Sequence, residues 1–148
     1  MVKRVLITGA NKGIGFAISR RCLLDHEDTV VILGSRSIER GKAAIEALAA
    51  ENAAWRDRVL LLQLDTASDA SVAAAKATLV KELGGDEHGS LYAICNNAGI
   101  AGGELSDIFN VNVRGPRRVD TAFLPLLDPE DGRIVQVSSG AASQCVQK

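Results

Sequence analysis

Short apolar runs rich in Val, Ile and Leu alternate along the chain with longer segments whose apolar residues recur at helical spacing. The short runs predict buried β-strands, because branched aliphatic side chains fit a pleated surface that is covered on both faces. The predicted strands are Arg4 to Thr8, Thr29 to Leu33, Val59 to Leu64, Leu91 to Cys95 and Arg133 to Val137.

The segments between these runs predict helices. The first opens near Gly13 and places Ile14, Ile18 and Cys22 on one face, with Leu24 beside them. The others are expected over Ser37 to about Asn52, Ser68 to Leu83 and about Leu105 to Leu127, the last bending at Gly115-Pro116. Their inward-facing residues are expected to include Ile38, Ile45, Leu48, Val72, Ala75, Leu79 and Leu83.

The regular strand-helix order predicts the fold class. Each helix crosses from one strand to the next, which makes neighbouring strands parallel. The chain is therefore expected to be an α/β protein with a doubly wound parallel sheet. No repeat, low-complexity tract or linker divides it, so residues 1–148 form one predicted domain.

Composition and charge narrow the function classes. Lys and Arg total 17 against 18 Asp and Glu, so no basic surface predicts nucleic-acid binding. No apolar run approaches the roughly 18 residues of a membrane span, and the start has no secretory signal pattern. The cysteines, Cys22, Cys95 and Cys145, have no metal-ligand spacing and are expected to be free thiols in the cytoplasm.

The stretch TGANKGIG, Thr8 to Gly15, follows the first predicted strand directly. Its glycine spacing is neither G-x-G-x-x-G nor that of a P-loop, which disfavours a P-loop or flavodoxin-like domain. Gly9 permits a tight turn, Gly13 permits close approach of a pyrophosphate, and Gly15 permits close helix packing. The turn and the helix N-terminus behind it predict a phosphate site, the alternative being an ordinary tight turn.

The end of the second predicted strand reads LGSRS. An NAD site would place an acidic residue there for the ribose 2′-OH, whereas this chain has Ser35 and Arg36, with Lys12 in the glycine turn. Such cations suit a 2′-phosphate and favour NADP(H), unless they are only solvated surface charges.

Further motifs follow in order, namely LLQLDTAS with Asp65, NNAG at 96–99, NVNVRG with Asn112, and VSSG with Ser139. Together with Thr8 to Gly15 they resemble the short-chain dehydrogenases/reductases, and within them the NADPH-dependent carbonyl reductases. The resemblance runs from Lys3 to about Ser143 and implies a Rossmann-like sheet of strand order 3-2-1-4-5. The cofactor site that it implies consists of Gly9, Asn11, Lys12, Gly13, Ile14, Gly15, Ser35, Arg36, Asp65, Thr66, Asn97, Ala98 and Gly99.

The resemblance also implies hydride transfer from NADPH to a small carbonyl substrate such as an aldehyde, ketone or quinone. Ser139, at a strand's carboxyl end, can hydrogen-bond the substrate carbonyl and stabilise developing negative charge. Asn112 is expected to hold a water or a backbone group in a proton relay. No residues are predicted to bind a metal ion.

Two departures separate the chain from this pattern. Relatives follow the Ser with Tyr-x-x-x-Lys, in which Tyr is the general acid, but the single tyrosine here is Tyr92. The connection from Gly99 to Asn112 is also short. The chain is therefore expected to be C-terminally incomplete, truncated after the fifth strand, and inactive alone. One hypothesis is the cofactor-binding half of an oxidoreductase, and the other is a non-catalytic NADP(H)-binding module or partner of a full-length relative. Substrate identity and oligomeric state stay open.

Overall fold

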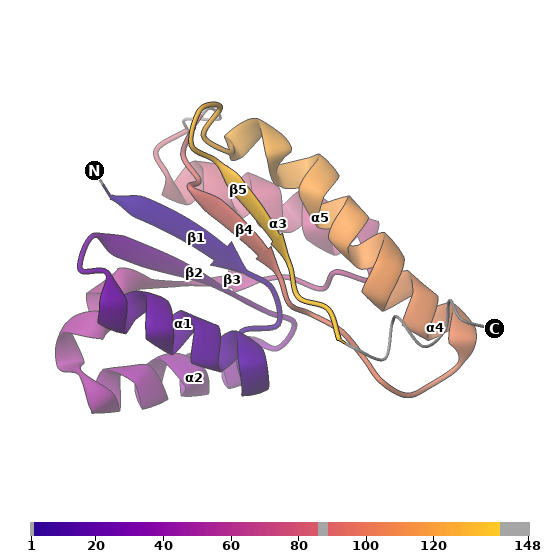
Figure 1. Ribbon diagram of the computed structural model, residues 1–148, viewed down its shortest axis with the longest axis horizontal. Helices are drawn as coiled ribbons and strands as arrows, with labels where there is room; N and C mark the ends of the chain where they lie inside the picture. The colour runs from indigo at the N-terminus through magenta and orange to yellow at the C-terminus, as the bar shows by residue number, and fades with distance from the viewer. Residues whose placement is uncertain (1, 86–88, 140–148) are drawn as a thin grey trace.

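A computed structural model of the chain describes residues 2–85 and 89–139. Its centre is a parallel sheet with strand order β3-β2-β1-β4-β5 (Figure 1). The strands are β1 (Lys3–Ile7), β2 (Thr29–Ser35), β3 (Val59–Gln63), β4 (Ala93–Asn96) and β5 (Arg133–Gln136). The predicted strands and the strand order of a doubly wound sheet are confirmed.

Helices cover both faces of the sheet. Figure 1 shows α1 (Gly13–Asp25) and α2 (Ile38–Glu51) together on one face, with α3 (Asp69–Glu82) and α5 (Gly115–Phe123) on the other. The short helix α4 (Leu105–Phe109) leads into α5. This arrangement produces two apolar layers, one on each side of the strands.

Adjacent residues of β1 supply both layers. Leu6 belongs to the cluster formed with α3 and α5, and Ile7 belongs to the cluster formed with α1 and α2. Both side chains are fully buried. Successive strand side chains point to opposite faces, so a continuous apolar run is what a doubly covered sheet requires.

The predicted inward face of α1 is wrong by one residue. Its buried residues are Gly15, Ser19 and Leu23, while Ile14 is 63% exposed and Leu24 is 50% exposed. A Cβ on Gly15 would lie 2.6 Å from the Gly9 carbonyl oxygen, so this glycine must face the glycine turn. That close contact sets the rotation of α1 about its axis. Ile18 and Cys22 are only partly buried and pack at the edge of the apolar cluster on this face of the sheet.

The inward faces of the next two helices follow the prediction more closely. In α3, Val72, Ala75 and Leu79 are buried as predicted. In α2, Leu48 is buried, but its other buried residues are Gly41 and Ala44. A Cβ on Gly41 would lie 2.3 Å from the Leu61 side chain, so α2 turns its small residues toward β3 and leaves Ile38 40% exposed.

The helical segment around Gly115 changes from π-helical to α-helical hydrogen bonding at the point where the sequence predicts a bend. A π-helical turn covers Asn110–Arg114, α5 begins at Gly115, and a 3-10 turn covers Leu124–Leu126. A Cβ on Gly115 would lie 3.1 Å from Thr66 Oγ1. The absence of a side chain at Gly115 therefore allows α5 to pack directly on the segment after β3.

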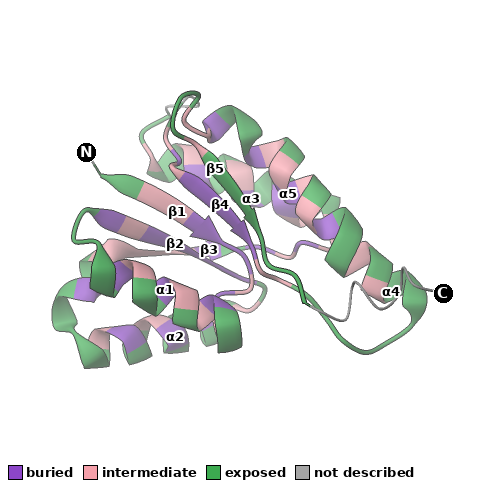
Figure 2. Ribbon diagram, in the orientation of Figure 1, coloured by how far each residue is buried: buried purple, intermediate pink, exposed green. Residues whose placement is uncertain are grey.

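The strand β5 lies at the edge of the sheet and differs from the others in burial. All of its residues are exposed, whereas β4 beside it is buried throughout, as Figure 2 shows in green and purple. Its apolar residues Ile134 and Val135 are 40% and 49% exposed. In the described residues 2–85 and 89–139, β5 pairs with β4 on one side, and its Gln136 side chain donates to Asp120 Oδ2 of α5 at 3.0 Å.

The described cysteines are free thiols, Cys22 half-buried and Cys95 buried, and burial raises the pKa of both. Cys145 lies outside the described residues. No helix in the ranges 2–85 and 89–139 is long and apolar enough to cross a membrane. In the same ranges, no His, Cys, Asp and Glu side chains cluster in a way that would hold a metal ion.

Candidate functional site

A cleft of about 420 Å³ opens at the carboxyl ends of β1 to β4, the ends marked by the arrowheads in Figure 1. It is lined by Gly9, Asn11, Lys12, Gly13, Ile14, Arg36, Ser37, Arg40, Leu64, Asp65, Thr66, Asn97, Ala98, Gly99, Ile100 and Val111. Most of the predicted cofactor residues are therefore brought together in one cavity. Ligands of doubly wound sheets bind at this edge, where the strand order reverses.

The glycine turn forms the floor of this cleft. Gly9 and Gly13 have φ angles of 64° and 56°, in the left-handed region that favours glycine. A Cβ on Gly9 would lie 3.0 Å from Ala98 Cα, whereas a Cβ on Gly13 would have no neighbour within 4 Å. Gly13 therefore leaves open space in front of the backbone where α1 begins.

The N-terminus of α1 has no side-chain cap. Lys12 is the N-cap residue of α1. Its backbone is extended, and its side chain forms no capping hydrogen bond with the first turn of the helix. The first N–H groups of a helix have no partner within the helix and carry a partial positive charge. Because Lys12, Gly13 and Ile14 line the cleft, these groups suit a phosphate there.

Thr8 and Asn97 hold the glycine turn against the end of β4. Thr8 Oγ1 accepts the backbone N–H groups of Asn97 and Ala98 at 3.0 and 2.9 Å. The Asn97 side-chain amide donates to the carbonyl oxygens of Thr8 and Gly9 at 3.0 and 3.3 Å. Thr8 is 1% exposed. Its hydrogen bonds to the end of β4 were not predicted from the sequence, although Thr8 begins the glycine motif.

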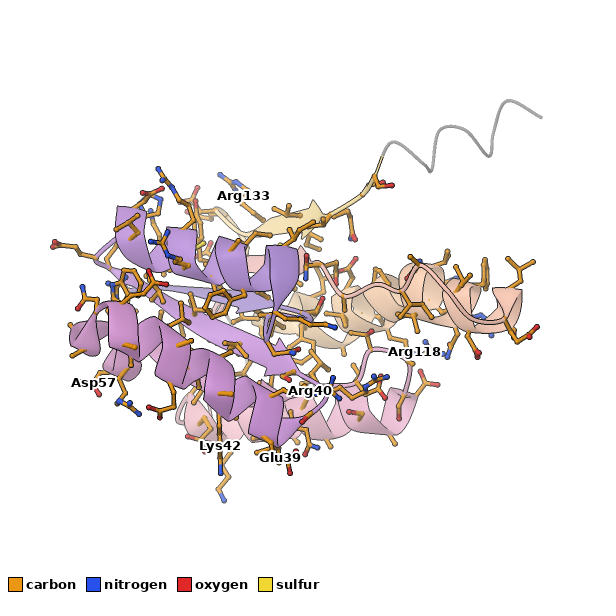
Figure 3. All side chains as sticks on the ribbon, turned by 90° about the horizontal axis from the view of Figure 1, so that it is seen from below. Glu39, Arg40, Lys42, Asp57, Arg118 and Arg133 are labelled. Carbon is orange, nitrogen blue, oxygen red and sulfur yellow. The ribbon has the colours of Figure 1, made fainter. Side chains whose placement is uncertain are left out.

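Cations line the cleft after β1 and after β2. Lys12, Arg36 and Arg40 line the cleft, and none of them forms an ion pair in the part of the chain that the structure describes. Figure 3 shows Arg40 at the start of α2. Arg40 was not predicted, yet the sequence carries a signal for it: Ser37 caps α2 by accepting the Arg40 N–H at 3.3 Å, which fixes Arg40 in the first turn.

Two predicted cofactor residues do not line the cleft. Ser35 is 1% exposed and donates its hydroxyl to the Ser37 carbonyl oxygen at 2.8 Å. Gly15 packs on Gly9 and lies behind the turn. Both residues therefore shape the walls of the site from behind.

Asp65 and Thr66 form the wall after β3. Asp65 Oδ1 accepts the Ala67 N–H at 3.0 Å, and the Asp65 N–H donates to Ser71 Oγ at 2.9 Å. Thr66 is 6% exposed and packs against Gly115. Asp65 is the single acidic residue among those that line the cleft.

The predicted catalytic residues lie outside the cleft lining. Asn112 Oδ1 accepts the Ile100 N–H at 2.8 Å, and Asn112 Nδ2 donates to the Ile100 carbonyl oxygen at 2.8 Å. Asn112 thus holds a backbone segment that does line the cleft. Ser139 is exposed and follows β5.

An open parallel sheet whose glycine turn presents helix N–H groups, beside a cationic end of the second strand, defines a Rossmann-like nucleotide-binding domain. The family model for short chain dehydrogenase matches residues 3–148, and the chain belongs to this family.

Among similar proteins, mouse "Carbonyl reductase [NADPH] 1" is 40% identical over 143 residues, covering 90% of this chain and 48% of the relative. Menthone neomenthol reductase from Mentha piperita superposes with a TM-score of 0.81 and 30% identity, over 95% of this chain and 61% of that one. NADPH-bound carbonyl reductase from chicken fatty liver superposes with a TM-score of 0.76 and 27% identity, over 95% and 60% of the two chains. The chain spans about half the length of the curated relatives that it matches.

Proposed function

We propose that this chain binds NADP(H) in the cleft and is the cofactor-binding part of an oxidoreductase that reduces small carbonyl compounds. The observation that carries the proposal is that Arg36 and Arg40, which follow β2, line one cleft with Lys12 of the glycine turn, with no acidic residue where a ribose 2′-OH would need one. The relatives support it, since carbonyl reductases named for NADPH are 40% identical to this chain.

The residues of the cleft fit such a cofactor. The open space at Gly13 and the uncapped N-terminus of α1 suit a pyrophosphate, because backbone N–H groups can donate to it. The guanidinium groups of Arg36 and Arg40 suit a 2′-phosphate, because they form charge-assisted hydrogen bonds with phosphoryl oxygens. Asp65 lines the same cleft and suits an amino group of the adenine.

When bound, NADPH supplies the hydride for carbonyl reduction. The residues of this chain that we assign to the reaction bind and orient. Ser139 donates a hydrogen bond to the carbonyl oxygen, which stabilises the negative charge that develops there. Asn112 holds the Ile100 backbone beside the cleft and acts as a positioning residue.

The product alkoxide also needs a proton. A serine hydroxyl is a weak acid near neutral pH, and these 148 residues contain no Tyr-x-x-x-Lys. General-acid catalysis contributes typically 10²–10⁴-fold to a rate. We therefore propose that the chain alone binds NADP(H) without measurable turnover. We also propose that it does so in the cytoplasm. Because these 148 residues lack the Tyr and Lys of that motif, the second candidate function is a non-catalytic NADP(H)-binding module or a partner of a full-length relative.

The two candidates differ in an assay that measures binding and turnover on the same sample. Cofactor binding is followed by NADPH fluorescence, and turnover by NADPH consumption with a quinone or an aldehyde. Binding without turnover, with activity gained when a segment bearing Tyr-x-x-x-Lys is joined after Lys148, supports the oxidoreductase. Binding that never becomes turnover supports the module. Turnover by the 148 residues alone that disappears in Ser139→Ala would contradict the assignment of the proton donor.

A further inference from the structure

A second cationic surface lies outside the cofactor cleft. A groove of about 430 Å³ runs between α3 and α5. Its apolar floor includes Val72 and Ala122, and Arg114, Arg117 and Arg118 line it. Because α3 and α5 lie on the face of the sheet opposite α1 and α2, this groove is separate from the cations at the end of β2 (Figure 1).

One of these arginines is already neutralised. Arg118 Nε donates to Asp69 Oδ1 at 2.7 Å, and Arg118 Nη1 lies within hydrogen-bonding distance of the Thr66 and Asn110 carbonyl oxygens. Its side chain is 18% exposed, and Figure 3 shows it between the two helices. Arg118 is therefore part of the structure of the groove.

The other two arginines keep their charge available. Neither Arg114 nor Arg117 forms an ion pair within the ranges 2–85 and 89–139. Arg114 lies over the Phe109 ring at 5.3 Å from its centre, which restricts its side chain but leaves its charge unpaired. Asp69 is the single acidic residue of the lining and is occupied by Arg118. The groove is therefore positively charged although the whole chain is near neutral.

The spacing of these charges selects a compact ligand. Residues three and four apart on a helix lie about 5–6 Å from one another at Cβ, so Arg114, Arg117 and Arg118 form one patch. Guanidinium groups bind phosphoryl oxygens through paired, charge-assisted hydrogen bonds. A nucleic acid or a long acidic segment would need cations spread over a larger surface.

We propose that the groove between α3 and α5 is a binding site for a small phosphorylated compound, distinct from the cofactor cleft. Arg114 and Arg117 bind its phosphoryl groups, Arg118 is held in place behind them by Asp69, and the apolar floor contacts the rest of the ligand. The proposal does not depend on which nucleotide binds in the cleft.

Calorimetric titration of the full chain with inorganic pyrophosphate at low salt tests this site. Because pyrophosphate also suits the cofactor cleft, the titration is repeated in Arg36→Gln/Arg40→Gln, where the groove should still bind. In Arg114→Gln/Arg117→Gln the groove affinity should fall at least about tenfold, since two charge-assisted contacts are lost. Arg21→Gln/Lys42→Gln removes the same charge from the exposed surface of α1 and α2 and should leave that affinity unchanged.

Amide chemical shifts provide a measurement that needs no variant. In the wild-type chain, pyrophosphate should shift the amide resonances of Ala73 and Ala122, which line the groove. The proposal is overturned if these resonances do not move, if Arg114→Gln/Arg117→Gln binds as tightly as wild type, or if Arg21→Gln/Lys42→Gln weakens binding equally. A glutamate-rich peptide that binds the groove more tightly than pyrophosphate would overturn the assignment of a small ligand.

Discussion

The side-chain amide of Asn97 donates to the Thr8 carbonyl oxygen at 3.0 Å, and Thr8 Oγ1 accepts the backbone N–H of Asn97 at 3.0 Å. These reciprocal hydrogen bonds join the ends of β1 and β4, which are neighbours in the sheet. They fix the glycine turn before any ligand is present. A phosphate site that is already ordered loses less conformational entropy when the ligand binds.

Replacing Thr8 by Val should therefore destabilise the chain. The substitution keeps the shape of the side chain but leaves the Asn97 and Ala98 N–H groups without their acceptor, at a cost of about 1–3 kcal/mol for a buried unpaired group. Urea denaturation measures the loss. Thr8→Ser retains the hydroxyl and serves as the control, so equal losses in both variants would contradict the role of this oxygen.

The Asn112 side chain should protect the Ile100 backbone from exchange with solvent. Asn112→Leu removes both hydrogen bonds to Ile100, each worth about 0.5–1.5 kcal/mol. Hydrogen exchange of the Ile100 amide should become faster, while exchange of the Leu6 amide in β1 should not change. Val113→Ala, at the neighbouring exposed position, is the matched control. Unchanged protection of Ile100 in Asn112→Leu would show that another group holds the segment.

The layers of the fold follow from short-range patterns. The apolar runs around Leu6 and Ile7 predict a doubly covered sheet, and the alternation of strands with helices makes it parallel. The rotation of α1 could not be predicted in this way, because it depends on a contact between Gly15 and the Gly9 backbone that no periodicity of apolar residues encodes. Ile14 is apolar and still faces the cleft.

The site was predicted where a motif lies on one loop and less well where residues meet across loops. Gly9, Gly13 and Asp65, which the sequence predicts to bind the cofactor, line the cleft. Ser35 and Arg36 are neighbours in sequence, but successive residues at the end of a strand point in opposite directions, so only Arg36 lines the cleft. Arg40 joins it from the first turn of α2, which requires knowing where that helix begins.

Asp128 should contribute acid-sensitive stability to the turn before β5. Its Oδ1 accepts the N–H groups of Glu130 and Asp131 at 2.9 and 2.8 Å, and these hydrogen bonds hold its pKa below the ordinary aspartate range. A carboxyl whose pKa is lower in the folded state stabilises the fold above its unfolded-state pKa, and this contribution is lost as pH falls through the folded-state value.

Thermal denaturation at neutral and acidic pH checks this expectation. Asp128→Asn keeps an oxygen acceptor but does not titrate, so its melting temperature should fall less between the two pH values than that of the wild type. Asp57 is an exposed carboxyl in the turn before β3, the strand at the other edge of the sheet, and provides the control variant Asp57→Asn (Figure 3). An identical pH dependence in wild type and Asp128→Asn would contradict the prediction.

The edge strand β5 should promote self-association of the isolated chain. Exposed apolar edge strands pair with other chains through their free backbone groups, and Ile134 and Val135 are 40% and 49% exposed. Light scattering should show association that rises with concentration. Val135→Lys should reduce it, whereas Val113→Lys, which adds the same charge at an exposed position of the π-helical turn before α5, should not. A monomer at all concentrations would contradict the prediction.

The measurement that tests the central proposal most directly is calorimetric titration of the chain with NADPH and with NADH. Charge-assisted contacts from Arg36 and Arg40 to a 2′-phosphate contribute roughly 1.5–3 kcal/mol, so NADPH should bind roughly tenfold to hundredfold more tightly. Arg36→Ala/Arg40→Ala should lose this preference and bind both cofactors with the weaker affinity, while Arg21→Ala should keep it. Equal affinity of the wild type for the two cofactors, or a preference for NADPH that survives Arg36→Ala/Arg40→Ala, would contradict the account.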